Sequence, residues 1–286
     1  MLWLILTLIS AICWSSADAL SKWISEDIGD FTNVWIRFIY STPFFLLLWV
    51  GIDIPPLDAE FWWALAWLVP LEVITWTLYL RAIRLSPLSL TIPFLGLTPV
   101  FLLVVPWILI GEQVSLIGGL GVVVIALGIY LLNVTKTEKG LLAPFKAIGS
   151  EKGSILMIIV AALFSLSSTF GKIAITHSSP LFFAGIYYPF VGLLLAPYAL
   201  SKSKVRTEAF SHPWRSIFIG ISFAGMALAH FYAIAIAKVA YMIAVKRTSL
   251  VFSSILGFIF FKETDIRERL LGGIIIIVGV FLIAMG

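Results

Sequence analysis

The chain has 286 residues, of which 61% are hydrophobic and only 12% are charged. This charged share is about half that of an average soluble domain, so too few polar side chains are available to cover a water-exposed surface. The composition excludes ordinary soluble enzymes and indicates an integral membrane protein. At roughly 20 residues per spanning helix plus a short connection, about ten helices fill the chain.

The reactive residue types exclude several kinds of site. Cys13 is the single cysteine, so an intramolecular disulfide or a cysteine metal site is excluded. The three histidines, His177, His212 and His230, lack metal-ligand spacing, and we expect neither a metal nor a cofactor. We interpret the net charge of +4 as membrane orientation and not as nucleic-acid binding. Residues 1–19 resemble a signal peptide without its positive start, so we expect a retained first span.

Apolar stretches separated by short polar connections predict ten helices in chain order. The expected ranges are 2–24, 33–51, 61–82, 88–110, 115–134, 154–175, 181–200, 215–237, 239–261 and 267–285. The longest connection, 135–153, is basic and separates a first five-helix unit, 1–134, from a second, 154–286.

The two units resemble each other at an offset of about 150 residues. The matching pairs are Trp14 with Phe164, Lys22 with Lys172, Gly121 with Gly272, and Gly128 with Gly279. Because five is odd, a tandem duplication places the second unit upside down in the bilayer. We therefore expect an all-α membrane protein with two inverted repeats, a design of many secondary transporters.

Positive charges predict the orientation. Of the nineteen Lys and Arg residues, Lys238 alone falls in an even-numbered connection, and thirteen lie in or beside the odd-numbered ones. The remaining five lie inside predicted spans. The positive-inside rule then places the odd connections in the cytoplasm and both termini outside. We expect a plasma (inner) membrane of a prokaryote.

These features together resemble the drug/metabolite transporter superfamily, in particular its ten-helix EamA-type branch. The resemblance covers the whole chain and rests on Trp14 and Lys22 in the first helix, Arg37-Phe38 in the second, and a glutamate followed by Gly-x6-Gly closing each half. It implies alternating access around a cavity lined mainly by helices 1–4 and 6–9. Members of the superfamily carry chemically diverse cargo, so the resemblance does not name a substrate.

Lys246 and Arg247 in the ninth span are the first candidate substrate ligands. The pair looks like the one by which plastid phosphate translocators of the same superfamily hold phosphate. Each buried cation costs at least ~2.5–3.5 kcal/mol on insertion scales, so a cavity, counter-ion or anionic ligand is expected. The alternatives are that both side chains reach the headgroups or pair with Glu72.

Glu72 lies near the middle of the third span, with Trp76 and Tyr79 on the same helix face. An intramembrane carboxylate is a candidate functional residue. Glu72 could carry protons, bind the amine of a zwitterion, or neutralise a nearby cation. Trp76 and Tyr79 either pack in the core or enclose the substrate.

Two further polar residues are candidates for the same cavity. His230 is equivalent to Tyr79 by the repeat offset, and it is either a hydrogen-bonded core residue or a titratable cavity residue. Arg37 matches the arginine of the family and is expected to line the cavity rim or link helices. Asp18 and Lys22 have i,i+4 spacing and could neutralise each other.

Glu112 and Glu263 each precede a predicted helix and are interpreted as structural helix caps. The glycines spaced by seven residues in the fifth and tenth helices predict close helix packing, including a possible contact between two copies.

The sequence thus predicts a secondary transporter, not an enzyme, for a small anionic or zwitterionic metabolite. We expect membrane lipid as its surroundings, no nucleic acid, and a monomer or homodimer. One alternative is an exporter of aromatic amino acids or amphipathic cations, with recognition by Glu72 and Trp76. The other is a sensor or scaffold without transport.

Overall fold

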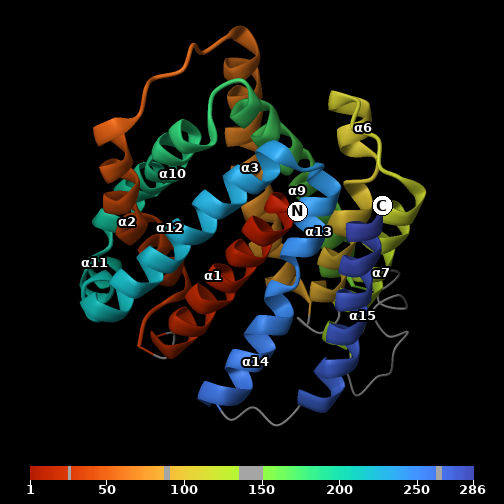
Figure 1. The fold of residues 1–286 in the computed structure, drawn as a ribbon. Helices are drawn as coiled ribbons and strands as arrows, with labels where there is room; N and C mark the ends of the chain where they lie inside the picture. Colours follow the sequence, from red (N-terminus) through yellow and green to blue (C-terminus); the bar gives the residue numbers. More distant parts are fainter. Residues whose placement is uncertain (25–26, 87–90, 135–150, 262–265) are drawn as a thin grey trace.

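The computed structural model describes residues 1–24, 27–86, 91–134, 151–261 and 266–286, and this part of the chain is helical without strands (Figure 1). The long helices are α1 (Leu2–Ile24), α2 (Asp30–Leu48), α3 (Ala59–Leu85), α7 (Leu116–Val134), α9 (Lys152–Thr176), α10 (Pro180–Ser201), α12 (Pro213–Ile236) and α15 (Ile266–Met285). The short ones are η1 (Trp49–Gly51), η2 (Ile92–Leu97), α5 (Thr98–Phe101), α6 (Val105–Ile110), α11 (Ser203–Ala209), α13 (Val239–Lys246) and α14 (Ser249–Phe261).

Most of these helices have the length and composition of membrane spans. Eight segments of the described chain are long and apolar enough to cross a membrane, with η2 to α6 counted as one segment and α13 with α14 as another. Two shorter apolar helices, Leu116–Leu132 and Leu271–Met285, belong to α7 and α15. The apolar helices indicate an integral multi-pass membrane protein. Each of the ten expected ranges overlaps one of these segments.

Two of the segments are interrupted. From η2 to α6, prolines stand at the first or second position of three successive helical pieces, Pro93, Pro99 and Pro106. The sequence predicts this interruption, because proline lacks the N–H that an uninterrupted helix needs. The ninth span is also interrupted, between Lys246 and Ser249, although it contains no proline. Here the Arg247 N–H donates to the Ala244 carbonyl, three residues back, at 3.0 Å.

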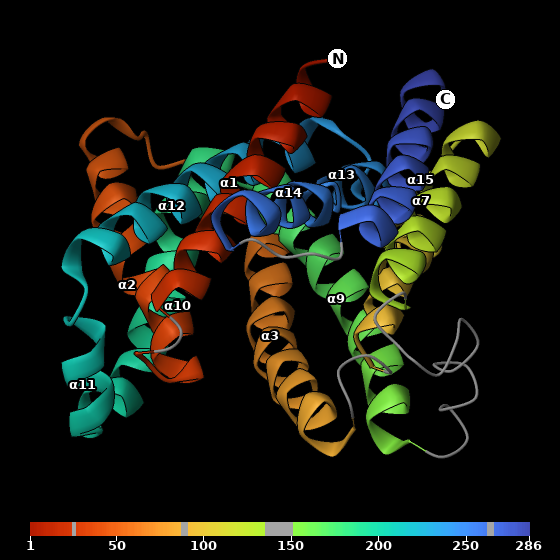
Figure 2. The same cartoon turned by 90° about the horizontal axis from the view of Figure 1, so that it is seen from below.

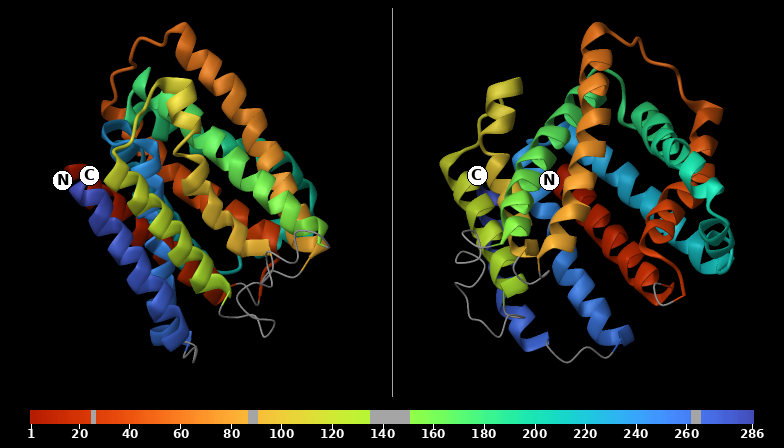
Figure 3. Two further views of the ribbon diagram at one scale, coloured as in Figure 1. Left: turned by 90° about the vertical axis from the view of Figure 1, so that its right-hand side faces the viewer. Right: turned by 180° about the vertical axis from the view of Figure 1, so that it is seen from behind.

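The helices pack in pairs that join the two halves of the chain. α1 runs along α12, α3 along α9, and α7 along α15, while α2 contacts both α10 and α12. Figure 2 shows α3 beside α9 and apart from α10 and α11. The two chain ends lie close together in every view (Figure 3), and Met1 and Gly286 line one pocket. We call the end of the bundle with Met1, Asp58, Glu112 and Lys238 the terminal face, and the opposite end, rich in lysine and arginine, the basic face.

Glycines bring the backbones of α7 and α15 into contact. A Cβ atom at Gly121 or at Gly279 would lie 2.7 Å from the carbonyl oxygen of the other residue. Gly128 and Gly272 face each other in the same way, with 2.9 Å in both directions. The sequence predicts that these glycines lie at a close helix contact, either within the chain or between two copies. In the structure they meet each other within a single chain.

We expect Gly279→Ala to destabilise the protein, because the added methyl group overlaps the Gly121 carbonyl and the Ile125 side chain. Overpacking of this kind costs about 1–3 kcal/mol, more than the gain of up to ~1 kcal/mol from alanine as a helix former. Thermal unfolding in detergent measures the effect. Gly119→Ala is the matched control, since its Cβ would meet only Val114 at 3.7 Å. Equal melting temperatures for the two variants would contradict the packing interpretation.

At the terminal face, Asp58 joins the start of α3 to the end of α9. Its Oδ1 accepts from the Phe61 backbone N–H at 2.9 Å, and its Oδ2 lies 2.6 Å from His177 Nδ1. These two hydrogen bonds hold the pKa of the Asp58 carboxyl below its ordinary value of 3.8. Because this carboxyl group has a depressed pKa in the folded state, its stabilisation is present above pH 4 and lost as the pH falls through the lowered value.

Asp58→Ala is therefore expected to lower the melting temperature at pH 7, and the deficit should shrink as the pH falls below about 4. Asp58→Asn retains an acceptor for the Phe61 N–H and should remove the pH-dependent part alone. Asp53→Ala, an exposed aspartate in the same connection, is the control. A deficit that is the same at pH 3 and pH 7 would contradict the role of the ionised carboxylate.

Candidate substrate-binding site

The interruption of the ninth span holds Lys246 and Arg247. Lys246 is the last residue of α13, and its ammonium group donates to His230 Nδ1 at 3.1 Å. The same group lies 3.4 Å from the Met226 sulfur and 4.7 Å from the centre of the Trp14 ring. Because lysine only donates, His230 Nδ1 is the acceptor and carries no proton in this arrangement. Lys246 is thus held by α12 and α1 through neutral groups.

Arg247, the next residue, has different surroundings from those of Lys246. Its Nε atom is buried and has no hydrogen-bond partner in the structure, and among the described residues no carboxylate forms an ion pair with its guanidinium. The Lys246 ammonium repels the guanidinium, and the Tyr79 phenol of α3 interacts with it electrostatically. The guanidinium therefore retains donor capacity for an oxyanion supplied from outside the chain.

Asp18 supplies the nearest negative charge on α1. It forms an ion pair with Arg37 of α2 at 2.8 Å and interacts electrostatically with Lys246. The i,i+4 partner that the sequence suggested, Lys22, instead lies over the Phe261 ring at 4.6 Å. Arg37 is therefore linked to Lys246 through Asp18. Among the described residues, Arg37 and Lys246 make no direct contact.

Glu72 forms a second polar centre, on α3. Its Oε1 accepts from the Trp76 indole N–H at 3.3 Å, and Trp76 meets Tyr79 edge to face with ring centres 5.6 Å apart. The carboxylate interacts electrostatically with Tyr187 and Tyr188 of α10. Within the described residues Glu72 forms no ion pair with the cations that the sequence suggested as its partners.

An aromatic cluster around Tyr188 joins α2, α10 and α12. The Tyr188 ring stacks on Phe231 at 5.4 Å and on Phe45 at 5.7 Å, and it meets Phe223 edge to face at 5.0 Å. Phe231 in turn contacts the ring of His230 at 5.4 Å. The cluster thus leads through Phe231 to His230 and Lys246, while Glu72 of α3 interacts with Tyr188 electrostatically.

The structure therefore gathers part of the expected site. Lys246 and His230 are in contact, with Arg247 and Tyr79 beside them, while Glu72 and Trp76 form the separate centre on α3. Residues that contact this region but were not proposed as ligands are Trp14, Asp18, Met226, Tyr188 and Phe231. Among these residues Trp14 had a signal in the sequence, since it belongs to the repeated motif. The packing of α1 against α12 brings Trp14 to Lys246.

Glu112 lies at the terminal face, where Gly111 ends α6 in a left-handed turn with φ of 69°. Its Oε2 accepts from the Val239 N–H at 2.8 Å, at the start of α13, and its other oxygen pairs with Lys172. The sequence predicted a cap on the helix that follows Glu112 in the chain, but the carboxylate binds the first turn of α13 instead. Glu263 lies outside the described residues.

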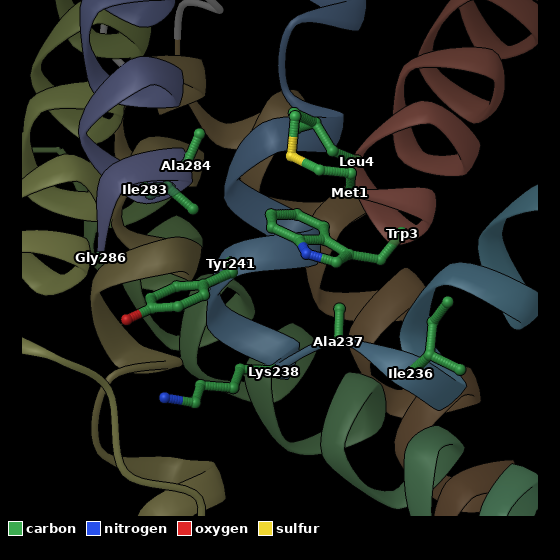
Figure 4. Close-up of a pocket in the computed structure, with 10 residues that line it drawn as sticks. All are labelled: Met1, Trp3, Leu4, Ile236, Ala237, Lys238, Tyr241, Ile283, Ala284 and Gly286. Atoms are coloured by element: carbon green, nitrogen blue, oxygen red, sulfur yellow. The ribbon is translucent and has the colours of Figure 1, made fainter.

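A pocket of about 310 Å³ opens on the terminal face between α1, α13 and α15 (Figure 4). Its walls include Trp3, Leu4, Lys238 and Tyr241. Neither Lys246 nor Arg247 lines it, so this pocket is distinct from the candidate site.

Comparison with known proteins agrees with this fold. The model of the EamA-like transporter family matches residues 1–134 and again residues 151–285. An uncharacterized transporter of Archaeoglobus fulgidus is 24% identical over 284 residues, covering 97% of this chain and 96% of its own. A crystal structure of 14% sequence identity has the same fold, with a TM-score of 0.74 over 99% of this chain and 96% of that one.

The protein is therefore an integral membrane transporter and not an enzyme. The chain belongs to the EamA-like transporter family, which confirms the resemblance found in the sequence.

Proposed function

We propose that the protein is a secondary transporter of a small anionic or zwitterionic metabolite, whose acidic group binds Lys246 and Arg247. The observation that carries this proposal is the buried Nε atom of Arg247, which has no hydrogen-bond partner among the described residues. A cation at such a position is costly, and an oxyanion ligand compensates it. Arginine suits this role because its planar fork binds carboxylate or phosphate in a bidentate manner.

We further propose that the transporter has ten spans arranged as two inverted repeats, 1–134 and 154–286, joined by the basic loop 135–153. The family model matches the chain twice, which supports a duplication. The packing supports it as well, because a two-fold relation that exchanges the halves turns the α1–α12 pair into the α9–α3 pair. The α7–α15 and α2–α10 pairs join equivalent helices of the two halves.

The departures from this symmetry favour alternating access. α12 packs against α2, whereas its counterpart α3 has no comparable packing against α10. At the terminal face Lys172 of α9 donates to the Ala237 carbonyl after α12 at 2.6 Å, which joins the two halves at that end. We propose that the basic face is cytoplasmic, in the inner membrane of a prokaryote, as the positive-inside rule implies.

Arg247→Ala is expected to weaken binding of the anionic ligand about tenfold to a hundredfold, because a hydrogen bond to a charged group contributes about 1.5–3 kcal/mol. A thermal-shift screen of the purified protein against phosphorylated, zwitterionic and cationic metabolites identifies the ligand. Uptake of that ligand into reconstituted vesicles then tests transport. At a ligand concentration near the Kd of the wild type, Arg247→Ala should therefore lose most of the shift and of the uptake while the yield of folded protein is unchanged.

Arg215→Ala is the matched control for this variant. Arg215 begins α12 at the basic face and lies over the Trp23 ring at 5.1 Å, away from Lys246. Arg215→Ala removes one positive charge, as Arg247→Ala does, and it should leave uptake unchanged. Undiminished uptake by Arg247→Ala would overturn the proposed site.

The aromatic surroundings of Glu72 favour a second candidate, export of aromatic amino acids or amphipathic cations. Here the Glu72 carboxylate would bind the ammonium group, with Trp76 and the Tyr188 cluster around the apolar part. The same thermal-shift screen separates the two functions. Stabilisation by cations that depends on Glu72 and is independent of Arg247 would establish this alternative.

Glu72 is also our candidate for proton coupling. If Glu72 carries the coupled proton, Glu72→Gln should abolish uptake driven by a pH gradient while ligand exchange between equal pH values continues. Glu60→Gln, an exposed carboxylate on the same helix, should behave as the wild type. Uptake with an unaltered pH dependence in Glu72→Gln would exclude this role.

A further inference from the structure

α13 is a helix of eight residues held at both ends by other elements. At its first residue, the Val239 N–H donates to Glu112 Oε2 at 2.8 Å. Two residues further, the Tyr241 hydroxyl accepts from the Ser115 backbone N–H at 2.9 Å. At its last residue, Lys246 donates to His230. At 1.5 Å per residue the helix is only about 12 Å long, and residues 239–245 are all buried.

A buried ion pair fixes the N-terminal end of this helix to the rest of the bundle. Lys172 of α9 pairs with Glu112 and also donates to the Ala237 carbonyl at 2.6 Å. The two side chains are only 12% and 16% exposed. Loss of either partner leaves an uncompensated buried charge, so the pair holds its geometry strongly.

We propose that Glu112 and Lys172 are positioning residues for transport. They hold the terminal face closed and fix α13, and through α13 they fix Lys246 and Arg247 at the opposite end. The proposal rests on the proposed function, because it takes Lys246 and Arg247 as the contacts of the substrate.

The geometry couples opening of the terminal face to movement of Lys246. Glu112 and Lys172 hold Val239 and Ala237, which flank Lys238 in the connection between α12 and α13. Opening of the terminal face must separate this connection from α9 and from the α6–α7 connection, so both bonds break together. A buried helix of two turns moves as one body, and its far end carries Lys246. Opening of the site to one face or the other is thereby linked to the position of Lys246 and Arg247.

Cysteine accessibility tests the proposal on the full chain in detergent. In a Cys13→Ser background, Val239→Cys and Ala244→Cys place reporters at the two ends of α13, both at 0% exposure. Glu112→Ala should raise the rate at which a polar methanethiosulfonate labels both reporters about tenfold or more, as expected for loss of charge-assisted hydrogen bonds. Glu112→Gln, which retains an acceptor for the Val239 N–H, should give a smaller increase and keeps the test available if the alanine variant does not fold.

Two controls separate positioning from general destabilisation. Ala17→Cys on α1 is 1% exposed and distant from the pair along the chain, and its labelling should not change. Glu151→Gln removes a carboxylate that accepts from Ser86 at 2.6 Å on the basic face, and it should leave both α13 reporters protected.

Unchanged labelling of Val239→Cys, or equal acceleration at Ala17→Cys, would overturn the proposal. Acceleration at Val239→Cys alone would also overturn it, because α13 would then fray without moving Lys246. Labelling requires no ligand, so these results are independent of whether Arg247→Ala loses uptake.

Discussion

Two adjacent cations, Lys246 and Arg247, lie inside one membrane span, and the helices around them must offset the cost of their burial. Insertion scales assign each at least ~2.5–3.5 kcal/mol, and the surroundings must compensate that cost. Lys246 is compensated within the chain by the His230 nitrogen, the Met226 sulfur and the Trp14 ring. Arg247 is not compensated in this way among the described residues. Lys246 therefore already has neighbours within the chain, whereas the Arg247 Nε–H has no hydrogen-bond acceptor among the described residues.

The interrupted ninth span makes this arrangement compatible with a membrane. Irregular backbone at membrane depth is tolerated where it is buried in protein or lines a cavity. The fourth and ninth spans are both interrupted, and both belong to the set that the family resemblance assigns to the cavity. Prolines interrupt the fourth span, whereas a tight turn at Arg247 interrupts the ninth.

Sequence reasoning was reliable where the membrane itself decides the structure. The helix ranges followed from apolar length, and the membership of the EamA-like transporter family is confirmed. The partners of the site residues could not be predicted, because contacts between spans decide them. Asp18 pairs with Arg37 of a neighbouring helix, although Lys22 lies one turn away on the same helix as Asp18. Glu112 binds Val239, which is 127 positions further along the chain.

Under the proposed function, we expect substrate specificity to arise where the two halves differ. Trp14 and Phe164 are equivalent by the repeat offset, and so are His230 and Tyr79. Around Trp14 and His230 the structure places the Lys246 ammonium, whereas Phe164 receives the edge of Trp76 at 5.8 Å, next to Tyr79. One framework therefore carries a cationic end and an aromatic end with a carboxylate. Under the proposed function, a solute with an acidic group and an apolar or amine-bearing body would satisfy both ends, while a dianion would place its second charge against Glu72.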